Sequence, residues 1–347
     1  MTTETVDARQ LEQVCSAVLQ HRDIPPDDAD FVAHTLVETD LRGVHSHGSM
    51  RLGRYVRELK SGVTNPHPRI GISEEGPAFA RVDGDGGLGQ LVGRLAMQTC
   101  MAKARSAGSA TVTAYRSRHF GAAGTYCLMA AAEGLIGLTM TVASSRLAPT
   151  GGSKALFGNN PIAMAVPGGQ EFPLLIDFAM GRIAAGKLEL AAAAGDTLPE
   201  GLVLDPDGKA TTDPQVGLQG SIAPIGEHKG YALTLMIEIL AGLLGGSPYF
   251  GVERDQVAQH VSQTGIGHFF MAIDPGRFMP LDRFTAAIAA MVEGIKNSPR
   301  LDGVDEILVP GEIEHRRRRE RLEKGIPLAA STVTMLRDLG AECGLEL

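Results

Sequence analysis

Residues 79–104, FARVDGDGGLGQLVGRLAMQTCMAKA, run from a short apolar segment through a glycine-rich turn into an amphipathic stretch. Residues 79–82 predict a β-strand and residues 90–104 predict a helix. Between them, Gly84-Asp85-Gly86-Gly87-Leu88-Gly89 matches G-x-G-x-x-G, a dinucleotide-binding pattern. No acidic residue follows about 20 positions later to hold a ribose, and Arg116 stands near there instead. We therefore favour a plain turn, and the strand–turn–helix order indicates an α/β protein.

Similar patterns continue on both sides of this segment. Before it, helical spacing predicts helices over residues 8–20, 26–41 and 49–59. After it, apolar or β-branched runs predict strands over 110–115, 136–142, 162–166 and 174–177. Further helices are predicted over 121–132, 231–244, 281–295 and 331–339, with a polar surface loop over 197–215. We expect the helices at the two ends of the chain to pack together.

Composition and charge exclude several classes of protein. The 347 residues carry a net charge of −8, which disfavours a nucleic-acid partner because phosphate binding needs a basic surface. The basic run 316–319 lies among glutamates and is interpreted as a solvated helix face with i,i+4 pairs. No apolar run is long enough to cross a membrane, and the four cysteines form no C-x-x-C pair. We expect free thiols and a cytoplasmic protein.

The segment Arg42-Gly43-Val44-His45-Ser46-His47-Gly48-Ser49-Met50-Arg51 is the first candidate for chemistry. Ser46 and His47 stand at a predicted loop-to-helix junction, where backbone N–H groups are free for a ligand. Arg51 and Tyr55 are four residues apart and share one helix face. An arginine suits a carboxylate, and a histidine can transfer a proton near neutral pH. The alternative is a helix-capping histidine beside a solvated arginine.

Three further stretches are candidates for binding or catalysis. His119 follows a predicted strand directly, a place where α/β proteins often carry catalytic groups, although a capping role is equally compatible. Gly and Asn in 149–152 and 158–161 permit close approach to a ligand, or simply form paired turns. Lys229 precedes a predicted helix and could hold an anion, form a Schiff base or be solvated. No spacing of His, Cys, Asp and Glu suggests a metal site.

Seven stretches in this order resemble the type 2 malate/L-lactate dehydrogenase family. They are 40–48 with Arg51, 117–124, 148–152, 158–161, 177–179, 226–231 and 310–312. The resemblance implies an α/β, non-Rossmann, malate/L-sulfolactate dehydrogenase-like fold in which a sheet-rich cofactor domain is inserted between helical parts. We expect an N-terminal helical part over 1–75, a sheet-rich NAD(P)-binding domain over 76–279 and a C-terminal helical part over 280–347. The family also implies a homodimer with the active site near the interface.

The resemblance further implies hydride transfer between NAD(P)H and C2 of a small 2-oxo or 2-hydroxy acid, with NAD favoured over NADP. His119, preferred to His47, would transfer the proton, with Ser46 beside them, while Arg51 holds the carboxylate and Tyr55 lines the pocket. Residues expected to contact the cofactor are Ser144, Asp177, Phe178, Ala179, Lys229, Gly230, Pro310, Gly311 and Glu312. The alternatives are a cyclic-imine carboxylate reductase and an inactive dinucleotide-binding or oligomeric protein.

The chain departs from the family pattern at a few positions. Arg118 replaces a usual Asn, Leu202 replaces a frequent Trp, and Met180-Gly181 replaces a usual Thr-Ser. The last change removes two hydroxyls expected to face the cofactor, so the sequence leaves cofactor affinity and the choice between NAD and NADP open.

Overall fold

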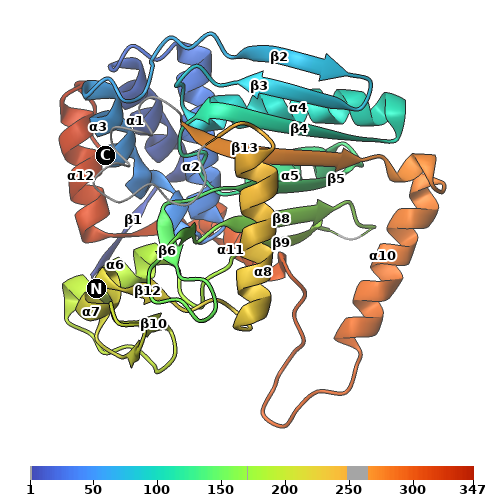
Figure 1. Ribbon diagram of the computed structural model, residues 1–347. Coiled ribbons are helices and arrows are strands. Elements are labelled where there is room, and N and C mark those ends of the chain that lie inside the picture. Colours follow the sequence, from blue (N-terminus) through green and yellow to red (C-terminus); the bar gives the residue numbers. More distant parts are fainter. Residues whose placement is uncertain (1, 170, 248–264) are drawn as a thin grey trace.

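The computed structural model describes residues 2–169, 171–247 and 265–347. Within these residues, the largest sheet has seven strands in the order β2-β3-β4-β13-β5-β8-β9 (Figure 1). The β3–β4 pair is parallel and the other pairs are antiparallel. The strands are β2 (Gly71–Gly76), β3 (Phe79–Asp83), β4 (Ser109–Ser117), β5 (Ile136–Thr141), β8 (Pro161–Val166), β9 (Leu174–Ala179) and β13 (Ile266–Ile273).

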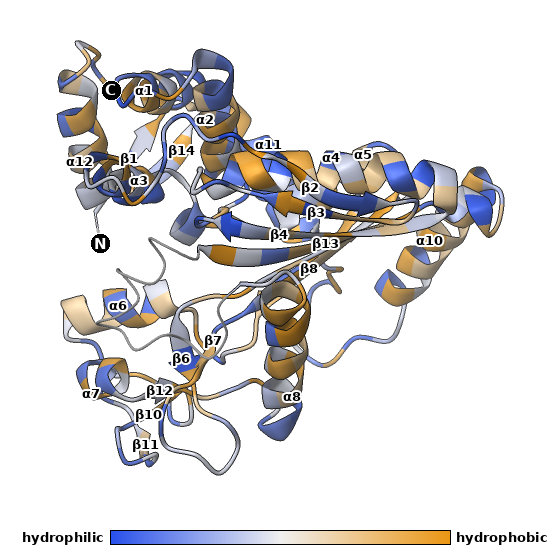
Figure 2. Ribbon diagram, turned by 45° about the horizontal axis from the view of Figure 1, so that its top comes forward, coloured by the Kyte–Doolittle hydropathy of each residue, from blue (hydrophilic) through white to orange (hydrophobic). Residues whose placement is uncertain are grey.

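Helices cover both faces of this sheet (Figure 2). Helices α4 (Gly89–Ala107) and α5 (Gly124–Ala132) pack on one face. The segment formed by α8 (His228–Ile237) and the π-helical turn η3 (Glu238–Leu243) packs on the other. Because side chains alternate along a strand, the neighbours Phe269 and Phe270 in β13 enter opposite cores. The sheet is therefore a buried central layer.

The central strand β13 was missed in the sequence analysis. It pairs with β4 on one side and β5 on the other, and His268, Phe269 and Phe270 are all buried. A strand buried on both faces shows a continuous apolar run rather than an alternating pattern, which makes it hard to recognise. The predicted strands at β3, β4, β5, β8 and β9 are confirmed with shifts of one or two residues at their ends.

The two ends of the chain pack together in one helical part. Helices α1 (Ala8–Gln20), α2 (Pro26–Leu41), α3 (Leu52–Lys60) and α12 (Ala330–Ala341) share one core (Figure 1). The strands β1 (Thr3–Val6) and β14 (Ile326–Ala329) pair beside them. The carboxylate of Asp7 caps α1 by accepting bonds from the backbone N–H groups of Arg9 and Gln10. Helices α1 and α2 begin and end where the sequence predicted.

A smaller layer is built from short strands. These are β6 (Ser145–Leu147), β7 (Phe157–Gly158), β10 (Val203–Leu204), β11 (Ala210–Thr211) and β12 (Ser221–Ile222), in the order β11-β10-β12-β6-β7. Helices α6 (Ala185–Ala194) and α7 (Pro214–Gln219) flank them. The predicted polar loop over 197–215 lies here; it contains the two-residue strands β10 and β11 and ends in the first residues of α7. Two further α-helices of the described residues are α10 (Leu281–Lys296) and α11 (Glu312–Lys324).

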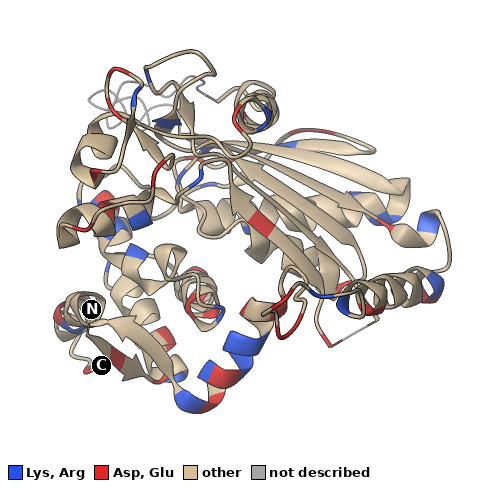
Figure 3. Ribbon diagram, turned by 90° about the horizontal axis from the view of Figure 1, so that it is seen from below, with Lys and Arg blue, Asp and Glu red and all other residues tan. Residues whose placement is uncertain are grey.

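The basic run of residues 316–319 differs from its prediction. Arg316 makes the expected i,i+4 pair with Glu312, but Arg318 pairs with Glu38 of α2, so α11 is fastened to the terminal helical part. Along the rest of the ribbon, acidic and basic residues are intermixed (Figure 3). None of the helices described is both long and apolar enough for a membrane span. The division into three domains stays a prediction, although β2 places the start of the large sheet at Gly71.

Candidate active site

A cleft of about 2060 Å³ lies between the terminal helical part and the two sheets. Its walls come from α2, the loop after α2, the start of α5, β9, α6 and α11. It collects most of the residues singled out in the sequence. Those that line it are Ser46, His47, Arg51, His119, Ser144, Asp177, Phe178, Ala179, Pro310 and Gly311.

Asp40 shapes the loop that carries Ser46 and His47. Its carboxylate is fully buried and accepts hydrogen bonds from the Ser49 backbone N–H at 2.7 Å and from Nδ1 of His45 at 2.7 Å. A Cβ atom at Gly48 would lie 2.1 Å from this carboxylate, so only glycine fits there. The sequence motif included Asp40 but gave no sign of this role. The loop is thus folded over a buried carboxylate rather than over solvent.

Ser46, His47 and Arg51 form one wall of the cleft. The Ser46 hydroxyl lies 2.9 Å from Nδ1 of His47, and Nε of Arg51 donates to the Ser46 carbonyl at 2.5 Å. The terminal guanidinium nitrogens of Arg51 make no hydrogen bond to the described part of the chain. Burial, with a smaller contribution from Arg51, lowers the pKa of His47 to about 4. This wall therefore presents a neutral imidazole beside a fixed cation.

His119 lies against this wall, on the loop between β4 and α5. Its ring stacks on that of His47 with a centroid separation of 5.5 Å and an interplanar angle of 19°. The Tyr55 hydroxyl lies 2.8 Å from Nδ1 of His119. Burial, reinforced by His47 and by arginines of the same wall, lowers the pKa of His119 well below its usual value. The structure thus brings together both imidazoles and the Arg51 guanidinium.

The position of Tyr55 differs from its prediction. Arg51 ends the 3-10 turn η2 (Ser49–Arg51) just before α3 and lines the cleft, whereas the Tyr55 side chain is 1% exposed and does not line it. Its hydroxyl bonds to His119 on one side and accepts from the Gln90 amide at 2.8 Å on the other. Tyr55 therefore supports His119 from behind, because α3 packs its apolar face inward at this position.

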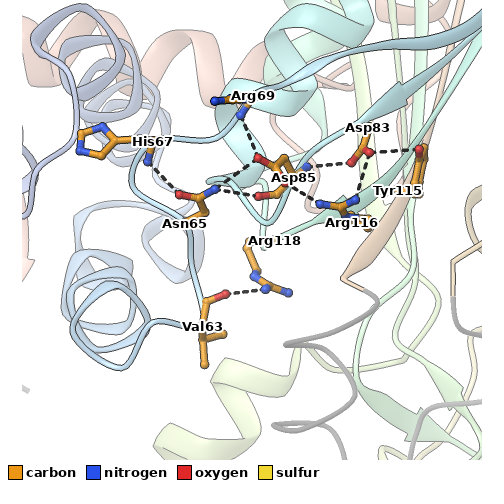
Figure 4. Close-up of polar contacts among 9 residues, drawn as sticks. All are labelled: Val63, Asn65, His67, Arg69, Asp83, Asp85, Tyr115, Arg116 and Arg118. Carbon is orange, nitrogen blue, oxygen red and sulfur yellow. Dashed lines mark hydrogen bonds and ion pairs between the residues drawn. The ribbon is translucent and has the colours of Figure 1, made fainter.

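The segment leading into His119 is tied to the chain after α3 (Figure 4). Asp85, in the glycine-rich turn, pairs with Arg116 at 2.5 Å, and its carbonyl oxygen accepts from Asn65 at 3.2 Å. Arg118 donates to the Val63 carbonyl. The glycine-rich turn itself does not line the cleft. Its glycines therefore serve the folding of the chain and not the binding of a phosphate.

The predicted cofactor residues of β9 line another wall of the cleft. The Asp177 carboxylate accepts the Gly124 backbone N–H at 2.8 Å, and burial raises its pKa to about 6. Phe178 is 41% exposed, which leaves its ring open to the cleft. The Pro310 carbonyl accepts from the Leu175 backbone N–H at 3.2 Å and so closes part of this edge strand. The wall combines apolar surface with a few polar groups, as ligand sites commonly do.

Three predicted cofactor residues lie elsewhere. Lys229 and Gly230 are in the first turn of α8, outside the lining of the cleft, and Lys229 is exposed. Glu312 is buried, and its carboxylate pairs with Lys296 and Arg316 at 2.5 Å each. Its oxygens are therefore used to join α10 and α11. The sequence showed the charges but not which helices would bring them together.

The Met180-Gly181 departure has a packing explanation. Met180 is fully buried in the core beneath the smaller sheet, and the Gly181 N–H donates to Asn159 at 2.6 Å. Neither residue lines the cleft. A Cβ at Gly181 would meet Ile222 at 2.6 Å and Asn159 at 2.9 Å, so close packing favours glycine at this position.

His268 is a further residue that sequence reasoning missed. It is fully buried, stacks on Phe120 at 4.4 Å, and bonds to Thr141 at 2.6 Å and to Ser117 at 2.8 Å. It thereby packs beneath the loop that carries His119. Burial lowers the pKa of His268 to about 3. The apolar run of β13 is the sequence signal that could have found His268, had it been recognised as a strand.

The described residues contain no group of three or more His, Cys, Asp or Glu placed to hold a metal ion. The four cysteines are free thiols.

A family model described as malate/L-lactate dehydrogenase matches residues 6–337 of the chain. This protein belongs to the malate/L-lactate dehydrogenase family. The chain is 40% identical to a malate dehydrogenase of Pyrococcus horikoshii over 95% of its own length and 92% of that protein. A solved structure of the enzyme from that organism superposes with a TM-score of 0.90, covering 99% of this chain and 97% of that one. The family and the fold expected from the seven motifs are confirmed.

Two other members of the malate/L-lactate dehydrogenase family are informative. A Delta(1)-pyrroline-2-carboxylate/Delta(1)-piperideine-2-carboxylate reductase of Pseudomonas putida is 33% identical over 97% of this chain and 97% of that protein. A (2R)-3-sulfolactate dehydrogenase (NADP(+)) of Chromohalobacter salexigens is 34% identical over 96% of this chain and 97% of that protein. Family members therefore differ in substrate.

Proposed function

We propose that this protein catalyses reversible hydride transfer between NAD(P)H and C2 of a small 2-oxo or 2-hydroxy acid. The observation that carries the proposal is the joint placement of His47, His119 and Arg51 in one cleft, with the terminal nitrogens of Arg51 open to a ligand. The relatives named as malate and sulfolactate dehydrogenases act on acids of this class. Because another relative is named as a cyclic-imine carboxylate reductase, a cyclic imine carboxylate is the alternative substrate.

The residues divide the work as follows. Arg51, already anchored through Nε, binds the substrate carboxylate and so fixes the position of C2. His119 exchanges a proton with the oxygen on C2, a step typically worth about 10²- to 10⁴-fold in rate. His47 and Ser46 border the same space and hold the substrate against His119. A carboxylate bound at Arg51 also adds negative charge beside both imidazoles, which favours their protonated forms.

The cofactor fits the remaining cleft. Its volume exceeds the roughly 300–1,000 Å³ of a typical small-molecule site, which leaves room for a dinucleotide beside the substrate. Ser144, Asp177–Ala179 and Pro310–Gly311 are the residues that would hold it. When bound, the nicotinamide would supply a hydride to C2 of the substrate or accept one from it. We favour NAD, because Asp177 and Glu314 both line this side and carboxylates favour a ribose hydroxyl over a ribose phosphate.

Substitution of the two histidines tests this function. His119→Ala and His47→Ala are expected to abolish turnover of 2-oxo acids while NADH still binds, as measured by fluorescence titration. His67→Ala is the matched control, since His67 is exposed and outside the cleft. The substrate panel contains 2-oxo acids and a cyclic imine carboxylate, each with NADH and NADPH. Turnover at wild-type rates in both cleft variants would reject the assignment.

A homodimer is proposed from the surface of α10. Of the described residues of this helix, Val292 is buried, whereas Leu281, Met291 and Ile295 are 41–48% exposed. Phe278, just before it, is 74% exposed, and the helix projects from the sheet in Figure 1. Apolar surface of this extent indicates an interface, and a second copy of the chain is the proposed partner. Light scattering of the wild type and of Phe278→Glu measures the expected change from dimer to monomer.

A cytoplasmic location is proposed from cysteine usage. Cys15, Cys100 and Cys127 are buried free thiols, which suits a reducing compartment. Cell fractionation tests it.

A further inference from the structure

Gln90 stands directly after the glycine-rich turn and is completely buried behind His119. It is the second residue of α4, whose start touches the backbone of the catalytic loop. A Cβ at Gly89 would lie 2.3 Å from the Arg118 carbonyl oxygen and 2.6 Å from the His119 carbonyl carbon. Glycine at this position therefore lets α4 approach closely enough for Gln90 to reach Tyr55. The turn thus serves the proton-transfer site from outside the cleft.

Three polar groups form a chain behind the imidazole. The Gln90 amide nitrogen donates to the Tyr55 hydroxyl at 2.8 Å, and that hydroxyl lies 2.8 Å from Nδ1 of His119. A phenol has one hydrogen, so accepting from Gln90 directs it toward Nδ1. The Gly121 N–H also points at Nδ1, at 3.4 Å. In this arrangement Nδ1 is an acceptor, and neutral His119 carries its proton on Nε2.

The opposite placement of the proton, on Nδ1 of His119, becomes possible when the oxygen of the Gln90 amide faces Tyr55. The Gln90 side-chain oxygen is buried and makes no hydrogen bond to the described residues. A half-turn of the amide would let this oxygen accept from Tyr55, whose own oxygen would then accept from Nδ1–H of His119. Nε2 would be left free to take the proton from a 2-hydroxyl, or to return it to a 2-oxo group. Acid–base transfer through Nε2 needs this second arrangement.

We propose that Gln90 is a positioning residue that selects, through Tyr55, which ring nitrogen of His119 carries the proton. The inference rests on the proposed function for the role of His119 in proton transfer. With the amide nitrogen toward Tyr55, His119 donates a hydrogen bond from Nε2. With the amide oxygen toward Tyr55, Nδ1 keeps its proton while Nε2 loses or gains one. A glutamine serves both arrangements because it is both donor and acceptor.

The other groups that face His119 do not supply this selection. His47 and Arg51 border it in the cleft, Arg54 adds positive charge from α3, and His268 lies beneath the loop. All of these disfavour the charged imidazole. Among the described residues, Tyr55 and the Gly121 N–H are the groups that bond to Nδ1. Since the backbone group can only donate, the choice of nitrogen falls to the Gln90–Tyr55 pair.

Two substitutions separate the arrangements. In Gln90→Glu an ionised carboxylate can only accept, so Tyr55 donates to it and Nδ1 of His119 holds the proton. In Gln90→Met neither donor nor acceptor remains, so Tyr55 donates to Nδ1 and the proton stays on Nε2. Gln98→Glu is the matched control, because Gln98 is exposed on the same helix.

The readout is the ¹⁵N chemical shift of the two ring nitrogens of His119 in the ligand-free protein, assigned by the signal lost in His119→Asn. Gln90→Glu is expected to place the proton on Nδ1 and to move the titration midpoint of His119 upward by about one pH unit. Gln90→Met is expected to place it on Nε2 and to lower kcat about 10- to 100-fold with NADH affinity unchanged. The same tautomer and midpoint in wild type and both variants overturns the proposal.

A double variant tests whether the effect of residue 90 on His119 passes through Tyr55. Tyr55→Phe breaks the chain, so adding Gln90→Glu to it is expected to leave the His119 signals of Tyr55→Phe unchanged. A change in that double variant overturns the relay. Circular dichroism selects folded variants. If Gln90→Glu does not fold, Gln90→Met decides through kcat, and an unchanged kcat overturns the proposal. The NMR titration needs no turnover, so a protein that reduces no 2-oxo acid refutes the proposed reaction and leaves the relay tested separately.

Discussion

Replacing Arg51 is the sharpest test of the substrate site. Its Nε is engaged by the Ser46 carbonyl, which orients the guanidinium and leaves two terminal nitrogens for a carboxylate. Burial lowers the pKa of Arg51, but an arginine stays charged at neutral pH. Arg51→Met removes the whole clamp. Arg51→Lys keeps one charge but loses both the fork and the bond to Ser46.

The expected magnitude follows from the number of bonds lost. Each hydrogen bond between charged groups contributes roughly 1.5–3 kcal/mol, so two contribute roughly 3–6 kcal/mol. At about 1.4 kcal/mol for each factor of ten, Arg51→Met is expected to lower kcat/KM by about 10²- to 10⁴-fold. Arg51→Lys, which retains a single point contact, is expected to lose about 10- to 100-fold.

The assay is steady-state reduction of a 2-oxo acid with NADH, combined with a fluorescence titration of NADH. Arg57→Lys is the control on the adjoining helix α3, because Arg57 is exposed and does not line the cleft. The clamp is refuted if Arg51→Met stays within tenfold of the wild type. It is also refuted if NADH affinity falls as much as kcat/KM, since the arginine would then serve the cofactor.

Three further predictions concern the framework of the site. Burial lowers the pKa of His47 to about 4 and of His268 to about 3, so the unfolded chain binds protons at these positions that the folded protein excludes. The free energy of unfolding is therefore expected to fall as pH drops from 6.5 toward 4, by roughly 3 kcal/mol for His47 alone, in urea titrations. Glu312→Gln is expected to lower stability by about 1–3 kcal/mol, seen in thermal melts, with NADH affinity unchanged. Gly89→Ala is expected to lower the melting temperature and remove activity, because its Cβ would overlap a backbone oxygen after β4.

These three have their own controls. For the glycine, Gly294→Ala in α10 is the control, because a Cβ there meets nothing within 4 Å. Equal melting temperatures for Gly89→Ala and Gly294→Ala contradict the packing argument, as does unchanged urea stability between pH 6.5 and 4 for the histidines. A loss of NADH binding in Glu312→Gln would support the cofactor contact that the sequence analysis predicted for Glu312.

Local sequence predicted the parts of the fold that depend on short-range periodicity. Helices α1 and α2 were placed to the residue, because an apolar stripe and a first-turn signal lie within the segment itself. Strand β13 was not predicted, because its apolar run looks alike whether a helix or a sheet buries it. The site followed the same division. His47, His119 and Arg51 could be named from their motifs, whereas Tyr55, expected to line the pocket, is buried behind His119.

The sequence by itself determined the family, the α/β class and the loops that carry the candidate catalytic residues, since each motif is a short run of neighbouring residues. Only the tertiary structure decided that Gln90 reaches Tyr55, that Tyr55 reaches His119, and that Glu312 is held by Lys296 and Arg316. Donor and acceptor roles depend on which atoms face each other across helices and strands. That pairing is fixed by how α3, α4 and the large sheet pack, and no pattern within a single segment records it.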